Sequence, residues 1–449
     1  MPVTVAIVGA GPSGFYAAAA LVKSGLDCSV HFIEALPTPF GLIRGGVAPD
    51  HQNTKGVART FAKTAADERI GYFGNVRLGQ DVSLPELRDI FDAVVIALGA
   101  PMDRELAVPG GDKPGAFGAA AFVGWYNGHP DFIDLNPDLN VERVCVIGNG
   151  NVALDVARVL AKTPEEMANS DLPDYAAEAI HSAPIREIVL IGRRGPTEAK
   201  FTNKELSELN DLAACVPVAD AGELPEAVPS RLNDRARRLA EKNLETFRLF
   251  ARRTAGERPK TLRFRFYAQP VEVLGAHRVE GLRLERTEVR RGHAVATGET
   301  FDIPCGLIVS AIGYRMAPVK GLPIDSGSQV VRNRDGRVAP GLYVVGWAKR
   351  GPTGVIGSNK SDGDLAAAQI AEDLGVGGKP GAPALEALLH QRGVTWVTFD
   401  DWLRIEAAEI AAAPPGAPRR KLIRIKDMLA VLGREATDVG PRPLERGAL

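Results

Sequence analysis

The chain has 449 residues, 45% of them hydrophobic, and its 55 acidic and 54 basic residues leave a formal net charge of -1. A chain of this length is expected to form two or three domains with complete cores. The balanced charge argues against nucleic acid or an anionic membrane as a general partner. The sequence shows neither an apolar run approaching ~20 residues nor a secretory signal, so the expected location is the cytoplasm.

The first recognisable motif is the GxGxxG fingerprint formed by Gly9, Gly11 and Gly14. Residues 3–8 are the β-branched, apolar run of a buried parallel strand, and residues 15–24 predict a helix. Glycines are needed between them because the turn is tight and a pyrophosphate must approach bare backbone at the helix N-terminus. This context of strand, turn and helix makes the motif specific for a dinucleotide.

The charge that follows the first fingerprint indicates which dinucleotide it takes. Residues 29–33 predict a second strand, and Glu34 stands at its end. This position is about 20 residues past the last glycine, where a carboxylate accepts hydrogen bonds from ribose hydroxyls. The first site is therefore predicted to bind FAD.

A second fingerprint runs from Gly148 through Asn149, Gly150, Asn151 and Val152 to Ala153, which replaces the third glycine. It lies between a predicted strand at 143–147 and a predicted helix at 152–160. The next predicted strand, 187–192, comes after a polar insertion at 161–186 and ends in Arg193 and Arg194 instead of an acid. Two guanidiniums suit a 2′-phosphate by bidentate, charge-assisted bonding. The second site is therefore predicted to prefer NADPH.

Two similar strands bracket the second fingerprint. Residues 91–100 form an apolar strand that ends on small residues, and residues 306–314 repeat the pattern. The predicted fold is α/β, with two Rossmann-like domains and the NADP domain inserted into the FAD domain. The expected FAD-binding domain is discontinuous, 1–103 and 321–449, and the NADP-binding domain is 104–320.

The last part of the chain returns to flavin-domain character. Residues 341–347 predict a strand that delivers Trp347 to the glycine-rich loop 350–357, whose backbone N–H groups suit the flavin pyrimidine edge. Without that loop, Trp347 would be interpreted as a core or rim aromatic. The remaining expectations are a linker at 375–388 and helices at 362–374, 399–413 and 422–432.

The four cysteines, Cys28, Cys145, Cys215 and Cys305, are scattered without a CxxC pair. This spacing argues against a metal or iron-sulfur site in the chain. We expect all four to be free thiols that serve as small buried hydrophobes in a reducing compartment.

The whole chain resembles the ferredoxin:NADP+ reductases of the adrenodoxin reductase type, the group that includes FprA-like enzymes. The resemblance implies an NADPH-dependent, FAD-containing oxidoreductase that passes electrons singly to a small [2Fe-2S] ferredoxin, in a pathway such as a cytochrome P450 or iron-sulfur assembly. Besides the fingerprints, it rests on residues 36–44, 46–51, 122–127, 148–158 and 346–357.

The resemblance also assigns residues to the two cofactors. Contacts to FAD are expected from Gly9, Gly11, Ser13, Gly14, Glu34, Leu42 and Leu78, with Trp347, Gly354, Val355 and Ile356 around its ring. Contacts to NADP are expected from Arg104, Asn149, Gly150, Asn151, Val152, Arg193, Arg194 and Glu205, with Gly354 near the nicotinamide.

His51 and Asp155 match the family's polar pair beside the flavin, and no nucleophilic side chain is required for hydride transfer. Asp155 would orient the nicotinamide carboxamide or, with His51 and water, tune proton movement near the flavin. Two plainer interpretations stay open. Asp155 suits a first-turn acid that complements the helix dipole, and an isolated His51 suits a structural histidine.

A basic segment suggests where an acidic ferredoxin would dock. Positive charge at helical spacing would steer such a partner in a salt-dependent way, and a solvated helix face with Glu241 and Glu245 interleaved is the alternative. The basic residues are Arg231, Arg235, Arg237, Arg238, Lys242, Arg248, Arg252 and Arg253, of which Arg231, Arg235, Arg238 and Lys242 are the expected docking positions.

Other functions would use the same cofactors. A disulfide reductase needs a redox cysteine pair and a flavin monooxygenase an FxGxxxHxxxW signature, and the sequence has neither. The alternative that remains is an NADPH-dependent electron-relay subunit or diaphorase with an acceptor other than ferredoxin.

Overall fold

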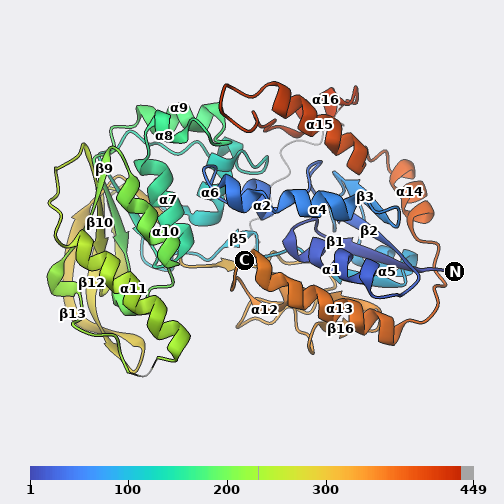
Figure 1. The fold of residues 1–449 in the computed structure, drawn as a ribbon, viewed down its shortest axis with the longest axis horizontal. Helices are drawn as coiled ribbons and strands as arrows, with labels where there is room; N and C mark the ends of the chain where they lie inside the picture. Colours follow the sequence, from blue (N-terminus) through green and yellow to red (C-terminus); the bar gives the residue numbers. More distant parts are fainter. Residues whose placement is uncertain (231, 436–449) are drawn as a thin grey trace. The chain divides into compact units, whose positions relative to one another are not determined.

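The computed structural model describes residues 1–230 and 232–435, and Figure 1 labels many of their helices and strands. The chain divides into two compact units. Unit 1 comprises Met1–Met102, Asn127–Ile133 and Tyr314–Leu449, and unit 2 comprises Asp103–Tyr126 and Asp134–Gly313. The main boundaries fall at 102/103 and 313/314, whereas the sequence led us to expect 103/104 and 320/321. The return of 127–133 to unit 1 had no counterpart in any sequence pattern.

Unit 1 is built on a six-stranded sheet in the order β16-β17-β4-β1-β2-β3. All neighbouring pairs except β16 and β17 are parallel. β1 is buried along its whole length, as expected for a central strand that is apolar on both faces. The strands are β1 (Val3–Val8), β2 (Cys28–Glu34), β3 (Ile70–Gly74), β4 (Ala93–Ile96), β16 (Arg337–Ala339) and β17 (Leu342–Val344).

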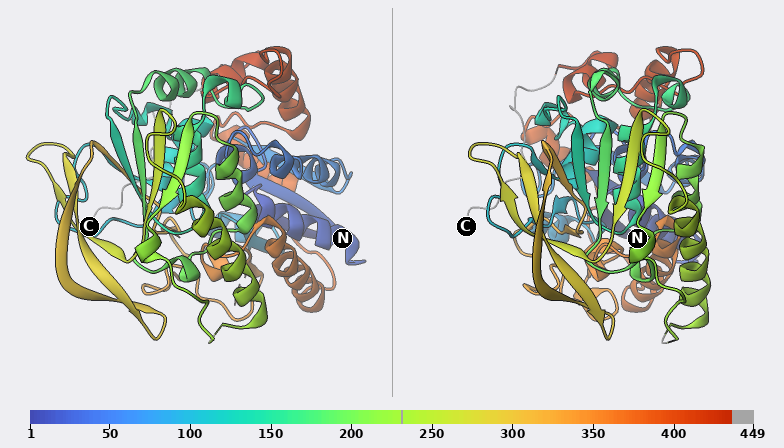
Figure 2. Two further views of the ribbon diagram at one scale, coloured as in Figure 1. Left: turned by 60° about the vertical axis from the view of Figure 1, so that its left-hand side comes forward. Right: turned by 90° about the vertical axis from the view of Figure 1, so that its left-hand side faces the viewer.

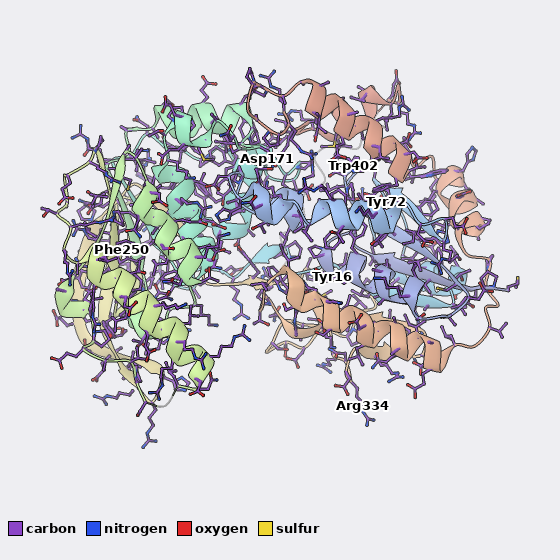
Figure 3. All side chains as sticks on the ribbon, viewed as in Figure 1. Tyr16, Tyr72, Asp171, Phe250, Arg334 and Trp402 are labelled. Carbon is purple, nitrogen blue, oxygen red and sulfur yellow. The ribbon has the colours of Figure 1, made fainter. Side chains whose placement is uncertain are left out.

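Helices of unit 1 come from both ends of the chain. α1 and α13 pack closely because Gly363 of α13 has no side chain: a Cβ there would lie 2.6 Å from the carbonyl carbon of Tyr16, which Figure 3 labels. The helices are α1 (Pro12–Lys23), α2 (Leu42–Gly45), α3 (Gln52–Lys55), α4 (Ala58–Ala65), α5 (Leu84–Ile90), α12 (Trp347–Arg350), α13 (Asn359–Asp373), α14 (Ala382–Gln391), α15 (Phe399–Ala411) and α16 (Ile425–Val431).

Two details of the C-terminal part were predicted wrongly. The expected linker at 375–388 contains the start of α14, whose Leu385 and Leu389 are fully buried. Gly381, with φ 66°, is the residue that precedes this helix, so the Gly and Pro residues there mark a helix start rather than a continuous loop. Trp347, expected at the end of the strand 341–347, is the first residue of the short helix α12, because β17 already ends at Val344.

Unit 2 contains a second six-stranded sheet, in the order β6-β14-β7-β8-β10-β9, with every pair parallel. Its strands are β6 (Ala116–Gly118), β7 (Arg143–Ile147), β8 (Glu187–Ile191), β9 (Cys215–Ala219), β10 (Lys260–Arg265) and β14 (Leu307–Ser310). Its helices are α6 (Ala119–Asn127), α7 (Asn151–Ala161), α8 (Pro164–Met167), α9 (Asp174–Ser182), α10 (Asn203–Glu208) and α11 (Asp234–Phe250). Two very short strands, β5 (Met102–Asp103) and β15 (Tyr314–Arg315), mark the boundaries between the units.

A three-stranded antiparallel sheet, β11 (Ala268–Leu274), β12 (Gly281–Arg290) and β13 (His293–Pro304), packs against one face of this parallel sheet. Its Val273, Leu282 and Leu284 form one buried cluster with residues of β7 and β8 that include Cys145 and Val189. Figure 2 shows these long yellow strands beside the green and teal strands of the parallel sheet. No pattern in the sequence predicted this antiparallel layer.

The prediction for the cysteines is confirmed: Cys28, Cys145, Cys215 and Cys305 are free and buried. Burial raises the pKa of the Cys215 thiol to about 12, which keeps it protonated at neutral pH. Among residues 1–230 and 232–435, no helix is both long enough and apolar enough to cross a bilayer.

We expect His31 of β2 to make the free energy of unfolding depend on pH. Its ring lies 5.8 Å from that of Phe91, and within the described residues its Nδ1 is buried without a hydrogen bond. Burial lowers the pKa of His31 from 6.5 to about 4. As the pH falls through this window, the unfolded chain takes up a proton that the folded chain does not, so stability is lost, by up to about 3 kcal/mol at pH 4.

Urea unfolding at pH 7, 6, 5 and 4 measures this loss. We expect His31→Leu to flatten the pH dependence relative to the unchanged protein, whereas His277→Leu, a matched change at an exposed histidine, should leave it as it was. If the free energy of unfolding of His31→Leu falls with pH as steeply as that of the unchanged protein, other groups cause the pH dependence.

Candidate dinucleotide sites

The turn between β1 and α1 uses its three glycines in different ways. Gly9 has a φ of 107°, and a Cβ there would lie 2.6 Å from the carbonyl oxygen of Ala97. A Cβ on Gly14 would lie 2.2 Å from the carbonyl oxygen of Gly9. Beside Gly11, by contrast, the nearest atom to such a Cβ among the described residues is a backbone carbon 3.9 Å away. Gly9 and Gly14 therefore allow close packing, and Gly11 leaves bare backbone at the start of α1 for a pyrophosphate to approach.

Glu34 is the last residue of β2, as predicted, and it is tied to the same turn. Its Oε2 accepts the N–H of Ala10 at 2.7 Å, and its Oε1 accepts the N–H of Leu36 at 3.1 Å. Burial raises the pKa of Glu34, while these backbone hydrogen bonds act in the opposite direction. The carboxylate is thus held in a fixed position beside the fingerprint.

The glycine-rich segment after β17 meets the first fingerprint inside unit 1. A Cβ on Gly346 would lie 2.0 Å from Oγ of Ser13, so the two segments are in direct contact. The N–H of Gly346 donates to Oδ2 of Asp362 at 3.1 Å, and Asp362 also pairs with Lys349 at 3.0 Å. Residues at opposite ends of the sequence therefore build one site.

Beyond Gly346, the predicted ring contacts lie on a short irregular stretch. Trp347 stacks on Tyr314 with 6.0 Å between ring centroids, and its Nε1 donates to the carbonyl of Thr353 at 3.1 Å. Gly354 has a φ of 86°, Val355 is 65% exposed, and Ile356 begins a single 3-10 turn. The backbone here is thus fixed by local hydrogen bonds while an apolar side chain faces outward.

Leu42 and Leu78 are the other predicted FAD contacts in unit 1. Leu42 opens α2 and is 46% exposed, and the preceding Gly41 packs against Gly11, since a Cβ on Gly41 would lie 2.9 Å from the Cα of Gly11. Leu78 is half-buried and lies two residues after Val76, whose N–H donates to the carbonyl of Glu34 at 2.9 Å.

A buried ion pair connects α2 to α15, a helix of the C-terminal part of unit 1. Arg44 donates through Nη1 to Oε2 of Glu409 at 2.9 Å, and Glu409 is fully buried. The guanidinium of Arg44 also lies 5.3 Å from the ring of Trp402, which is labelled in Figure 3. Glu409 also accepts the N–H of Leu422 at 2.8 Å. Burial acts to raise the pKa of Glu409, but the charge of Arg44 and these hydrogen bonds outweigh it and hold the pKa below its usual value. Sequence reasoning missed this link, because no local pattern relates residues so far apart.

The second fingerprint has the same geometry in unit 2. Gly148 has a φ of 151°, and a Cβ there would lie 2.6 Å from the carbonyl oxygen of Ala311, which follows β14. A Cβ on Gly150 would have no neighbour within 4 Å among the described residues. Ala153, at the third position, is fully buried in α7, so this site accepts the methyl group that position 14 excludes.

Side-chain and backbone bonds connect the second fingerprint to the other predicted NADP contacts. Asn151 accepts the N–H of Thr202 through Oδ1 at 2.9 Å, and the Thr202 hydroxyl caps α10 by accepting the N–H of Glu205 at 3.4 Å. Asn149 donates through Nδ2 to the carbonyl of Arg194 at 3.4 Å. Val152 follows at the start of α7. The fingerprint, the arginine pair and Glu205 are therefore brought together within one unit.

The arginine pair lies directly after β8, as expected. Arg193 is exposed, and Arg194 is half-buried with its Nη1 donating to the carbonyl of Gly292 at 3.4 Å. Arg104 is exposed, and its N–H donates at 3.1 Å to the carbonyl of Gly313, which lies three residues after the end of β14.

His51 and Asp155, the predicted polar pair, belong to unit 1 and unit 2 respectively. The carbonyl of His51 accepts the N–H groups of Thr54 and Lys55 at the start of α3. Asp155 pairs with the almost fully buried Arg158 at 2.9 Å. Because α7 begins at Asn151, Asp155 lies outside its first turn. The interpretation of Asp155 as a first-turn acid is therefore wrong, and an interaction with His51 stays a prediction.

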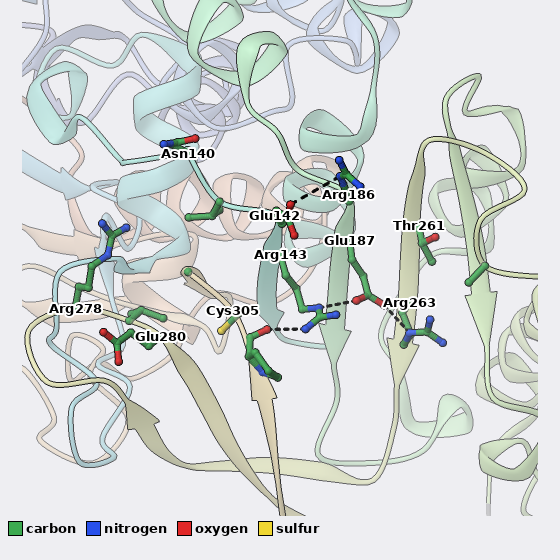
Figure 4. A pocket seen from close by; sticks show the side chains of 15 residues that line it. Asn140, Glu142, Arg143, Arg186, Glu187, Thr261, Arg263, Arg278, Glu280 and Cys305 are labelled. Atoms are coloured by element: carbon green, nitrogen blue, oxygen red, sulfur yellow. Dashed lines mark hydrogen bonds and ion pairs between the residues drawn. The ribbon is translucent and has the colours of Figure 1, made fainter.

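A pocket of about 740 Å³ opens in unit 2 at the amino ends of β7, β8 and β10. Figure 4 shows that Glu187 lies between Arg143 and Arg263 there. The fingerprint follows the carboxyl end of β7. The pocket therefore lies at the opposite ends of the strands from the predicted NADP contacts. It contributes none of the residues assigned to either dinucleotide.

Two Rossmann-like units, each with its own fingerprint, define the class: an α/β protein with two dinucleotide-binding domains. Residues 3–194 match the family model described as pyridine nucleotide-disulphide oxidoreductase. The chain is 42% identical to NADPH-ferredoxin reductase FprA of Mycobacterium tuberculosis, with 96% of this chain and 99% of the relative aligned. It is 40% identical to the mitochondrial NADPH:adrenodoxin oxidoreductase of Homo sapiens, covering 96% and 92% of the two chains.

The solved structure of Mycobacterium tuberculosis FprA in complex with NADPH superposes with a TM-score of 0.92, at 42% identity, covering 96% of this chain and 99% of that one. Together with the sequence relatives, this likeness places the chain in the FprA and adrenodoxin reductase family of flavoproteins. The family resemblance drawn from the sequence is thereby confirmed.

Proposed function

We propose that the chain is an FAD-containing, NADPH-dependent ferredoxin reductase. The observation that carries the proposal is the pair of fingerprints with opposite following charges, Glu34 in unit 1 and Arg193 with Arg194 in unit 2. Bound FAD would supply the redox chemistry that links a two-electron hydride donor to a one-electron acceptor. The residues of the chain bind and orient the two dinucleotides, and the reaction belongs in the cytoplasm, in line with four free thiols.

The residues of unit 1 fit FAD. Gly11 presents open backbone at the N-terminus of α1, where unpaired N–H groups and the helix dipole favour a pyrophosphate. Glu34 is held beside the turn for the ribose hydroxyls, and its two backbone bonds leave further lone pairs on each oxygen. The exposed side chains of Leu42 and Val355 are suited to apolar contact with the cofactor.

The residues of unit 2 fit NADPH. Gly150 offers the same open backbone at the start of α7. The exposed guanidinium of Arg193 and the half-buried one of Arg194 supply the positive charge for a 2′-phosphate. Asn149 and Asn151 bind the turn to its neighbours, so that the site is rigid before the dinucleotide arrives.

The surface of α11 supports an acidic [2Fe-2S] ferredoxin as the partner. Arg235, Arg238 and Lys242 are exposed and recur at i, i+3 and i+7, which places them on one face of the helix. Arg248 and Arg253 instead donate to Glu226 and Asn210 within unit 2. The docking face is therefore narrower than the basic segment as a whole. The fourth expected docking residue, Arg231, lies outside the described residues.

Reversing the charge of this face tests the partner. We expect the triple change Arg235→Glu, Arg238→Glu and Lys242→Glu to lower kcat/KM for a [2Fe-2S] ferredoxin by roughly 10- to 1,000-fold at low salt, because steering and docking both depend on charge. NADPH-driven reduction of ferricyanide, a small acceptor, should not change. The purified protein should show a flavin spectrum, and its ferredoxin-dependent cytochrome c reduction should weaken as salt is added.

The matched control reverses three exposed arginines elsewhere, Arg186, Arg332 and Arg404. It has the same net charge, so equal losses in the two triple variants would remove α11 as the docking face. Flavin reduction by NADPH with no stimulation by any ferredoxin would instead support the alternative, a diaphorase or an electron-relay subunit.

A further inference from the structure

The hairpin formed by β12 and β13 touches the arginine pair from the antiparallel layer of unit 2. Thr287 of β12 donates its hydroxyl to the carbonyl oxygen of Arg193 at 2.8 Å. The turn of the same hairpin supplies the carbonyl of Gly292, which accepts Nη1 of Arg194 at 3.4 Å. Two bonds from one hairpin therefore hold two consecutive arginines.

Thr287 is itself held in one orientation. It is 5% exposed, and its N–H donates to the carbonyl of Tyr267 at 2.8 Å. The pairing of β12 with β13 shifts register between Glu285 and Thr287, and an irregularity of this kind re-aims the next side chain. The Thr287 hydroxyl points at the backbone of Arg193 for this local reason.

The carbonyl of Arg194 is also fixed, by Nδ2 of Asn149 and by the N–H of Tyr267, each at 3.4 Å. Of these hydrogen bonds to Arg193 and Arg194, the one from the Thr287 hydroxyl to the Arg193 carbonyl is the shortest, at 2.8 Å. A restrained backbone reduces the conformational freedom that two long side chains lose when they close on a phosphate.

We propose that Thr287 is a positioning residue for the 2′-phosphate and so a determinant of the preference for NADPH over NADH. The inference rests on the proposed function, because Arg193 and Arg194 are the groups that Thr287 would position. Thr287 acts through the Arg193 carbonyl and does not touch the dinucleotide.

The test compares adenosine 2′,5′-bisphosphate with 5′-AMP as probes, titrated calorimetrically into the FAD-loaded protein. Thr287→Val keeps the shape of the side chain and removes the hydroxyl. We expect it to weaken binding of the bisphosphate about 3- to 10-fold, the usual effect of one lost hydrogen bond, and to leave 5′-AMP affinity unchanged. KM for NADPH should rise by the same factor at constant kcat, and Thr287→Ser, which restores the hydroxyl, should recover both values.

The matched control is Thr297→Val on the same hairpin, since the Thr297 hydroxyl donates to the carbonyl of Arg286 at 3.0 Å. We expect it to leave both affinities unchanged. Equal weakening of the two probes in Thr287→Val, or the same selective loss in Thr297→Val, would overturn the positioning role. If Thr287→Val does not fold, Thr287→Ala takes its place.

The result also separates this inference from the proposed function. If the unaltered protein binds the bisphosphate no better than 5′-AMP, the assignment of the phosphate site itself is wrong. If the unaltered protein discriminates and Thr287→Val discriminates equally well, only the role of Thr287 is lost.

Discussion

Replacing Arg193 and Arg194 together by Ala is expected to lower kcat/KM for NADPH by roughly 10²- to 10⁴-fold while changing that for NADH little. In the proposed site each guanidinium makes a charge-assisted hydrogen bond to the 2′-phosphate, and each such bond contributes about 1.5–3 kcal/mol. The loss should appear mainly in KM, because the phosphate lies far from the transferred hydride and is bound equally before and during the reaction.

Steady-state rates with the two nucleotides and ferricyanide as acceptor measure this effect. A double change at Arg332 and Arg404, exposed arginines of unit 1, removes the same charge away from the fingerprint of unit 2 and should leave both efficiencies unaltered. Unchanged discrimination in the Arg193 and Arg194 variant would show that other groups select the nucleotide.

Gly14→Ala is expected to yield protein that binds little or no FAD and unfolds more easily. The added Cβ would lie 2.2 Å from the carbonyl oxygen of Gly9 and 3.2 Å from Cγ2 of Ile7. The first of these atoms belongs to the backbone and cannot turn aside, so α1 must move away from β1 and the turn that receives the pyrophosphate must open. Overpacking of this kind lowers the stability of the protein by about 1–3 kcal/mol. The opened turn is also expected to bind FAD poorly.

The flavin content of purified protein and the melting temperature with and without added FAD measure these effects. Gly375→Ala is the matched control, since a Cβ there has no neighbour within 4 Å among the described residues. A Gly14→Ala protein with full flavin content and an unchanged melting temperature would contradict the tight packing at position 14.

The elements around each fingerprint could be predicted from the sequence because their signals are local. The run of apolar residues before Gly9 predicts β1 by itself, and the two arginines after β8 need only the strand that ends before them. The predicted strand at 143–147 coincides with β7. Such patterns depend on neighbours along the chain, which the sequence contains directly.

Contacts between distant segments could not be predicted in this way. Nothing near Thr287 in the sequence indicates that its hydroxyl reaches Arg193, and nothing near Arg44 indicates Glu409. The α14 helix was hidden for a different reason: Gly381 and the prolines around it are equally typical of a loop and of a helix start. These features depend on how separate elements pack, and only the three-dimensional structure contains that information.

The ion pair between Arg44 and Glu409 has a consequence for how the protein is made. Residue 44 leaves the ribosome long before residue 409, and the whole of unit 2 is synthesised between them. The strand β17, which pairs with β4, is also made after the whole of unit 2. The parts of unit 1 that meet at the first fingerprint therefore come together only after unit 2 has been made, and a nascent chain stopped before β17 will contain a complete unit 2 but lack Gly346, which packs against Ser13.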